Sequence, residues 1–238
     1  EKFKLIIKNS NNIVVFGGAG VSTESGIPDF RSAEGIYAPK LDQRFSPEKV
    51  LSHGFYKKHT EEFFEFYKKN MIYADAKPNP THIALAELER NGKLKAVITQ
   101  NIDGLHQMAG SKNVLELHGS IHRNYCEDCN TKFNLDFIIK SKVIPRCTKC
   151  SGVVRPDVVL YEEGLDMEVF EKAIDYIRKA DVLIVGGTSL VVYPAAGLIR
   201  YYEGDKLILI NKSKTQYDSY ALLTINENIG TIFNELLR

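Results

Sequence analysis

The chain has 238 residues, of which 44% are hydrophobic and 26% charged, enough for one large domain or one domain with a small insert. Its 31 basic and 30 acidic side chains lack the basic excess that is typical of proteins that bind nucleic acid regardless of sequence. No apolar run approaches the roughly 20 residues that span a bilayer, and residues 1–10 lack the apolar block of a signal peptide. We therefore expect neither a nucleic-acid nor a membrane partner.

Short, nearly continuous apolar runs are typical of parallel strands that are covered on both faces of a sheet. Such runs lie at Ile13–Phe16, Ala96–Thr99, Val114–Leu117, Val182–Val185 and Leu207–Ile210. Helical patterns are predicted at residues 1–10, 81–90, 166–180 and from 228 onwards. Strands that alternate with helices predict an α/β fold built on a doubly wound parallel sheet.

Two segments interrupt this alternation. Residues 32–75 show no strand pattern and carry aromatic-rich helical patterns, whereas residues 123–154 hold all the cysteines. We interpret both as excursions from a single sheet. The large domain is therefore predicted to be discontinuous and to consist of residues 1–31, 76–122 and 155–238.

A glycine turn, Gly18-Ala19-Gly20, follows the first predicted strand, at the sheet edge where ligands of open α/β sheets bind. Glycines let backbone N–H groups approach a phosphate, and a helix that starts at residues 21–23 would add a favourable partial charge. The dinucleotide fingerprint is incomplete, because Thr23 replaces its last glycine and Asp42 follows no strand. A nucleotide site and a plain tight turn both remain open. The aromatic between opposite charges at residues 29–31 could cover a ligand.

Polar residues also follow the later strands at this edge. After the second and third strands they are Gln100, Asn101, Asp103 and His118. A histidine beside such groups is a candidate acid or base, because its ordinary pKa lies near neutrality. His106 and His122 are nearby alternatives, although we expect the first on a helix and the second at the start of the cysteine-containing insert.

The fourth and fifth strands end in the same way. Gly186 and Gly187 permit close backbone approach, and the hydroxyls of Thr188 and Ser189 can donate to a phosphate or a ribose. Asn211, after the fifth strand, is interpreted either as a ribose or adenine contact or as the cap of a turn.

The four cysteines form two Cys-x2-Cys pairs separated by 17 residues. They are Cys126, Cys129, Cys147 and Cys150. This spacing fits the tetrahedral thiolate set of one structural zinc, with a redox pair or an iron–sulfur cluster as the alternative. Four sulfur ligands leave no open position for water, so the metal should stabilise the insert rather than catalyse. The pattern is not a dispersed disulfide framework, which favours the cytoplasm.

In chain order these stretches resemble the sirtuin family, the NAD-dependent protein-lysine deacylases. The matching stretches are GAGVS with SGIPDFR, TQNID, HG, the two CxxC pairs, GTS with VYPA, and the closing strand with Asn211. Each is modest alone, but the ordered set covers nearly the whole chain and is highly specific. The resemblance implies a Rossmann-like NAD-binding large domain, a cofactor loop and helical insert at residues 32–75, and a zinc-binding module at residues 123–154. The short tails suggest a bacterial minimal core.

The resemblance also implies site residues. The implied NAD contacts are Gly18, Ala19, Gly20, Thr23, Asp29, Phe30, Arg31, Gln100, Asn101, Ile102, Asp103, His118, Gly187, Thr188, Ser189, Asn211, Lys212 and Ile229. The implied substrate contacts are Val158, Val159, Leu160, Tyr161 and Val191. The implied catalytic residues are Asn101, in the nicotinamide pocket, and His118, the general base on a ribose hydroxyl. NAD is then a consumed co-substrate, and nicotinamide and O-acyl-ADP-ribose are released.

The implied partner is an acyl-lysine protein or peptide, which the family pairs as an added strand between residues 158–163 and 187–192. Glu162 stands where the family usually has glycine, which predicts a bias towards basic peptides. Members that prefer acidic acyl groups carry Tyr-x-x-Arg in the helical segment, but residues 61–79 contain no arginine and are dominated by phenylalanines at 63, 64 and 66. We therefore expect an apolar acyl pocket that takes acetyl first and could also take longer fatty acyl groups. We also expect a monomeric protein.

Three alternatives to deacylation remain open at this point. Mono-ADP-ribosyl transfer to protein would use similar residues. A non-catalytic reader of NAD or acyl-lysine needs no base, so the presence of Asn101 and His118 together disfavours it. A Rossmann oxidoreductase is disfavoured by the missing strand acid and by the lack of a hydride-handling site.

Overall fold

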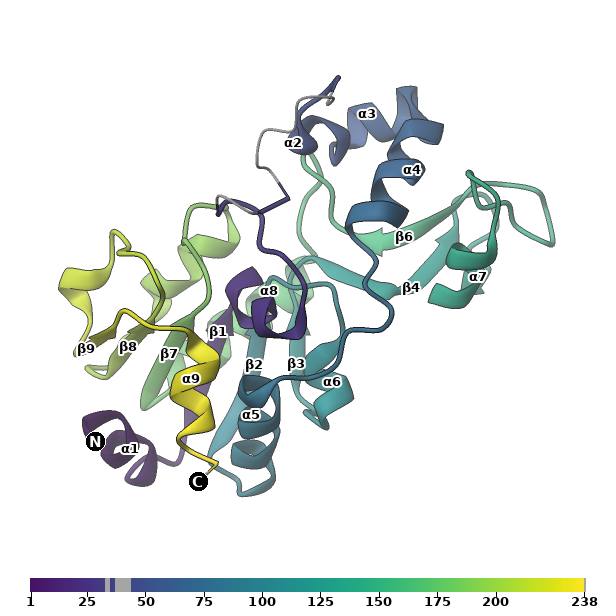
Figure 1. Ribbon diagram of the computed structural model, residues 1–238. Coiled ribbons are helices and arrows are strands. Elements are labelled where there is room, and N and C mark those ends of the chain that lie inside the picture. Colours follow the sequence, from purple (N-terminus) through teal and green to yellow (C-terminus); the bar gives the residue numbers. More distant parts are fainter. Residues whose placement is uncertain (33–34, 37–43, 238) are drawn as a thin grey trace.

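The computed structural model describes residues 1–32, 35–36 and 44–237, and its larger part is a six-stranded parallel sheet in the order β3-β2-β1-β7-β8-β9 (Figure 1). The strands are β1 Ile13–Gly17, β2 Leu94–Thr99, β3 Val114–Glu116, β7 Val182–Gly186, β8 Leu207–Ile210 and β9 Leu223–Ile225. The predicted doubly wound sheet and its five strands are confirmed. β9 was not predicted, because it is short and its residues are only half-buried.

Helices cover both faces of this sheet (Figure 1). One face carries α8 (Met167–Lys179) and the 3-10 helix η3 (Ala195–Tyr201), and the other carries α1 (Lys2–Lys8), α5 (Pro80–Arg90) and α9 (Ile229–Asn234). Alternate side chains of β1 serve the two cores: Val14 and Phe16 pack towards α8, whereas Ile13 and Val15 pack towards α5. This double burial explains the unbroken apolar run in the sequence. None of the helices in the described ranges is long and apolar enough to cross a membrane.

The two excursions from the sheet meet in one smaller lobe. It contains α2 (Pro47–Val50), α3 (His53–Lys58), α4 (Thr60–Asn70), α7 (Leu135–Lys140) and a second sheet of order β5-β4-β6, with β4 at Gly119–Cys126, β5 at Lys132–Phe133 and β6 at Val154–Val158. A continuous core joins Phe63 and Phe64 of α4 to Cys126 and Ile138 of the cysteine-containing module. β4 and β6 cross the predicted module boundaries at residues 122 and 154, so the domain division stays a prediction.

Candidate active site

The order of the large sheet reverses between β1 and β7, since the chain continues to β2 and β3 on one side and to β8 and β9 on the other. Open α/β sheets bind ligands in the crevice beyond the carboxyl ends of the strands at such a switch point. A cavity of about 540 Å³ lies there, lined by the ends of β1, β2, β7 and β8 and by residues 158–163 of the smaller lobe. The site therefore lies between the two lobes.

Nearly all the predicted ligand contacts line this one cavity. Every predicted NAD contact does so, as do four of the five predicted substrate contacts, Val158, Val159, Leu160 and Tyr161. Val191 is not among the lining residues, and its side chain is 54% exposed. Leu190 takes a left-handed backbone conformation with φ 55° and is buried, so the chain turns here and Val192 lines the cavity instead. The role of each lining residue stays a prediction.

The glycine turns after β1 and β7 touch each other at the base of the cavity. The Gly20 N–H donates to the Gly187 carbonyl at 2.8 Å. A Cβ on Gly20 would lie 2.7 Å from the Cα of Gly187, which itself has φ +62°. Only glycines permit this contact, and without side chains they leave the backbone of both turns uncovered.

The α-helix that we predicted to begin at residues 21–23 does not form. Two 3-10 turns, Ala19–Val21 and Thr23–Ser25, stand in its place. Gly26, with φ +81°, ends the second turn, and the carbonyl of Val21 accepts the side-chain amide of buried Asn79 at 2.7 Å. The turn therefore has no α-helix N-terminus directly behind it, and the N–H groups of Gly18 and Gly20 are already bonded to the carbonyls of Gly186 and Gly187.

A chain of hydrogen bonds fixes the polar residues that follow β2. The Asn101 amide donates to the Ser22 hydroxyl at 3.1 Å, and that hydroxyl donates to Asp103 at 2.7 Å. Asp103 also accepts the N–H of Leu105, where α6 (Leu105–Ala109) begins. Asn101 is buried, so these bonds hold its amide on the cavity wall. Ser22 lines the cavity but was not predicted, although its hydroxyl directly after the glycine turn was an available signal.

A second chain of hydrogen bonds joins the ends of β2, β7 and β8, and it passes over the end of β1, which lies between β2 and β7. The Gln100 amide donates to the Thr188 hydroxyl at 3.0 Å, and the Thr188 N–H donates to the Asn211 side-chain oxygen at 2.9 Å. The Asn211 amide nitrogen is buried without a partner among the described residues. Leaving a buried donor unpaired costs about 1–3 kcal/mol, so this amide fits an acceptor atom of a bound nucleotide.

His118 lies at the boundary between the lobes, directly before β4. Its Nδ1 lies 3.0 Å from the carbonyl oxygen of Gln100, so Nδ1 carries the proton and Nε2 keeps its lone pair. Burial lowers the pKa of His118 below its usual value, against the raising effect of that hydrogen bond, and the neutral form prevails at neutral pH. Gly119 has φ +76°, and any Cβ there would collide with the Asp157 carbonyl, so glycine is required where His118 enters the small sheet.

The cysteines converge as predicted. The Sγ atoms of Cys126, Cys129, Cys147 and Cys150 all lie within 4.8 Å of one another. Three of the sulfur–sulfur distances are 3.4, 3.4 and 3.6 Å, near the edge of about 3.8 Å that a tetrahedral site with zinc–sulfur bonds of about 2.3 Å requires. All four cysteines are free of disulfides. The cluster fits one structural Zn²⁺, held away from the cavity.

Comparison with known proteins places the chain in a family. The model of the Sir2 family matches residues 18–194. The NAD-dependent protein deacetylase of Clostridium perfringens is 65% identical over 238 residues, which cover 100% of this chain and 98% of that protein. That of Clostridium acetobutylicum is 61% identical, with coverage of 100% and 97%. The chain belongs to the Sir2 family.

Solved Sir2 structures share the whole fold. A Sir2–p53 peptide–NAD⁺ complex has a TM-score of 0.86 and 38% identity, and covers 100% of this chain and 96% of that one. Sir2Tm bound to a propionylated peptide gives a TM-score of 0.86 and 38% identity, with coverage of 99% and 96%. The predicted family, the Rossmann-like large domain and the small zinc-binding part are therefore confirmed.

This Sir2 protein also has two buried imidazoles near the hydrogen bonds that join Asn101, Ser22 and Asp103. The rings of His82, on α5, and His106, on α6, are 4.7 Å apart, and both side chains are almost fully buried. Burial lowers the pKa of His82 to about 4, against a raising effect of Asp103. Burial, together with the neighbouring His82, lowers that of His106 to about 3. Both rings are therefore neutral in the folded protein.

These imidazoles make the stability depend on pH. Their folded-state pKa values lie below the ordinary 6.5, so the unfolded chain binds more protons and stability is lost as pH falls below 6.5. With an ordinary pKa of 6.5 in the unfolded chain, these two groups alone lower the free energy of unfolding by about 2 kcal/mol between pH 6 and pH 5. Denaturant unfolding at pH 8, 7, 6 and 5 measures this slope. His106→Leu should remove about half of it, and an unchanged slope in that variant would contradict the assignment.

Proposed function

We propose that this protein removes acetyl groups from protein lysine side chains in an NAD-dependent reaction that releases nicotinamide and O-acetyl-ADP-ribose. The observation that carries this proposal is the position of His118. Its imidazole, with Nε2 free to accept a proton, lines the same cavity as the glycine turn on one side and residues 158–161 on the other. A base between a nucleotide turn and a peptide edge is what acyl transfer from lysine to a ribose requires.

Different side chains of the cavity are proposed to carry out different steps of this reaction. NAD supplies the ribose carbon that captures the acyl oxygen when nicotinamide leaves. Asn101, held by Ser22, is proposed to orient the nicotinamide side of that substrate. Nε2 of His118 is proposed to take the proton from a ribose hydroxyl, so that the hydroxyl oxygen can attack the acyl carbon. Water then completes the release of free lysine.

Mass spectrometry of an acetyl-lysine peptide incubated with the protein, with and without NAD, tests this function. We expect an NAD-dependent loss of the acetyl mass and a matching O-acetyl-ADP-ribose product. A gain of one ADP-ribose mass on a protein substrate would assign mono-ADP-ribosyl transfer instead. A peptide that binds but stays unchanged with NAD would leave a non-catalytic reader.

The wall of the predicted acyl pocket differs from our expectation. Phe63 and Phe64 do not line the cavity, because both are fully buried in the core of the smaller lobe, and Phe66 packs against the same core. On α4 the lining residues are Tyr67 and Asn70, one helical turn apart. The Tyr67 hydroxyl is buried without a partner among the described residues. The pocket therefore has two neutral polar groups among its apolar side chains.

This wall predicts the acyl preference. Tyr67 and Asn70 have the spacing of the Tyr-x-x-Arg pair, but Asn70 offers a carboxylate no positive charge. We propose that acetyl-lysine is processed faster than succinyl-lysine, and expect Asn70→Arg to raise desuccinylation about tenfold or more through a charge-assisted hydrogen bond. Rates on matched peptides measure both effects. Lys69→Arg, on the exposed side of the same helix, is the control, and faster desuccinylation by the wild type would overturn the proposal.

We propose further that the protein acts as a cytoplasmic monomer on acyl-lysine proteins, without nucleic acid or membrane. Cysteines gathered for a metal and free of disulfides support a reducing compartment. Light scattering after size-exclusion chromatography tests the monomer, whose expected mass is 26.9 kDa. A mass of twice that value would contradict it.

A further inference from the structure

Residues 159–163 form an edge of the cavity that is fastened to the helical insert. The Tyr161 N–H donates to the Leu51 carbonyl at 3.0 Å, and the His53 N–H donates to the Tyr161 carbonyl at 2.9 Å. These bonds hold the stretch from the side of α3. Its position relative to the cavity is therefore fixed by backbone contacts.

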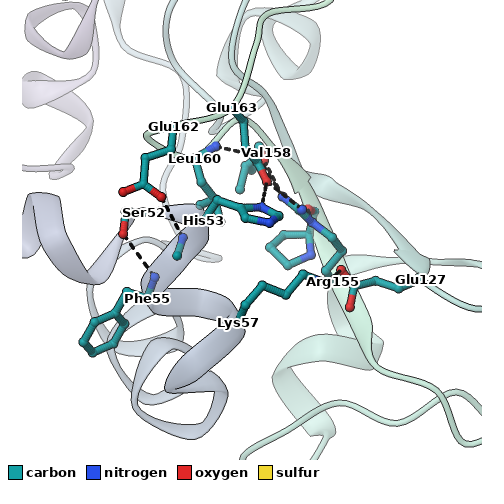
Figure 2. A network of polar contacts seen from close by, with 12 residues as sticks. Ser52, His53, Phe55, Lys57, Glu127, Arg155, Val158, Leu160, Glu162 and Glu163 are labelled. Atoms are coloured by element: carbon teal, nitrogen blue, oxygen red, sulfur yellow. Dashed lines mark hydrogen bonds and ion pairs between the residues drawn. The ribbon is translucent and has the colours of Figure 1, made fainter.

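Glu163 belongs to the same fastening, and its charge is balanced. Its two carboxylate oxygens accept from Arg155 at 2.8 and 3.1 Å, and one of them lies 2.8 Å from Nδ1 of His53 (Figure 2). The N–H of Leu160 donates to it at 2.9 Å. Arg155 carries the positive charge that balances this carboxylate, and it is itself buried. Glu163 is therefore a structural ion-pair residue and leaves little net charge at the cavity.

Glu162, the preceding residue, is held by a backbone N–H group and not by a charged side chain. Its backbone has φ +73°, and its carboxylate accepts the N–H of Gly54 at 2.8 Å (Figure 2). Among the described residues, no Lys, Arg or His nitrogen lies within 4.0 Å of this carboxylate. The residue is exposed and lines the cavity. The hydrogen bond therefore fixes a full negative charge at the rim without neutralising it.

On the side of the cavity formed by the smaller lobe, no other unpaired charge accompanies that of Glu162 among the described lining residues. Among the described lining residues of the smaller lobe, the charged side chains are those of Glu162 and Glu163, and Glu163 is paired. The lysines that line the cavity, Lys212 and Lys214, follow β8 on the nucleotide side. We infer that Glu162 is a specificity-determining residue, which favours acyl-lysine peptides that carry lysine or arginine beside the modified residue. The inference rests on the proposed function and names the substrate class of that site.

Two substitutions separate the charge of Glu162 from its contact. Glu162→Gln keeps an oxygen for the Gly54 N–H and removes the charge alone. Glu162→Gly suits the left-handed backbone and removes both. Glu171→Gln removes the same charge from the exposed face of α8, outside the cavity, and is the matched control.

The test compares acetyl-lysine peptides that differ only in lysine or glutamate flanks. For the wild type and Glu171→Gln we expect kcat/KM to favour the lysine-flanked peptide about two- to fivefold, as an exposed ion pair allows, and the ratio to shrink in about 0.5 M salt. In Glu162→Gln and Glu162→Gly the ratio should approach one. Equal turnover by the wild type, or an undiminished preference in Glu162→Gln, would overturn the inference.

Binding of the same peptides, measured by fluorescence anisotropy without NAD, keeps the two proposals apart. If no peptide loses its acetyl group but the wild type still binds the lysine-flanked peptide more tightly, the deacetylase proposal fails and the role of Glu162 stands. If deacetylation occurs and the two peptides bind equally, the function stands and the role of Glu162 fails.

Discussion

His118→Ala should lower kcat/KM for acetyl-lysine peptides by about 10²- to 10⁴-fold, the usual contribution of a positioned general base. This loss corresponds to about 3–5 kcal/mol of barrier height. The physical reason is that the Gln100 carbonyl fixes the Nδ1 proton, so that Nε2 is presented as the acceptor in the cavity. Alanine leaves no group there to take the ribose proton. Steady-state release of nicotinamide, confirmed by the acetyl mass of the peptide, measures the effect.

The pH profile of the wild type gives a second measure of this base. Burial lowers the pKa of His118, so the group is already neutral and competent below the ordinary value of 6.5. The acid limb of kcat/KM should therefore lie below pH 6.5, with a plateau at neutral pH. An acid limb centred above pH 7 would show that another group is the base.

His122 provides the matched control for the alanine variant. It is four residues further along the chain, its Nε2 lies 2.9 Å from the carbonyl of Asp103, and it is not among the residues that line the cavity. His122→Ala should cost far less activity than His118→Ala. Similar losses in the two variants would attribute the effect to disturbance of β4 rather than to loss of a base.

The sequence predicted the large sheet and its functional edge because both depend on local patterns. A strand such as Ile13–Phe16 is apolar at every position because both of its faces are buried. An apolar run of this kind therefore argued against a sheet with one face exposed to solvent. Parallel strands then place all their carboxyl ends at one edge. Asn101, His118 and Asn211 could therefore be assigned to one site although they are far apart in the chain.

The remaining contacts of the site could not be predicted from local sequence patterns, because they join segments that are distant in the chain. The Asn79 amide donates to the Val21 carbonyl, a contact that no property of residues 21–25 indicates. The aromatic residues of α4 gave a helical pattern, but only the packing of two excursions against each other decides that Phe63 is in the core and Tyr67 faces the cavity. Residues 33–34 and 37–43 of the predicted cofactor loop lie outside the described residues.

Removal of zinc should unfold the cysteine-containing module and abolish deacetylation. A structural zinc contributes an apparent 10–16 kcal/mol or so in zinc-finger peptides, as much as the whole stability of a typical domain. Here the loss would spread, because Cys126 and Cys147 are buried in the core that also holds Phe63 of α4 and Leu160, which lines the cavity. We expect one zinc per chain in the native protein. Treatment with a strong chelator, or the variant Cys147→Ser, should expose residues 123–154 to limited proteolysis.

The order of these losses tests the structural role of the metal. No cysteine lines the cavity, so zinc should act on turnover only through the fold of the smaller lobe. Proteolytic sensitivity, loss of the thermal transition and loss of activity should therefore appear together as zinc is withdrawn, and readdition of zinc should reverse them together. Lys149→Ala, an exposed side chain between two ligands, is the control and should keep its zinc. Activity lost while the module remains resistant to protease would give the metal a part in the reaction itself.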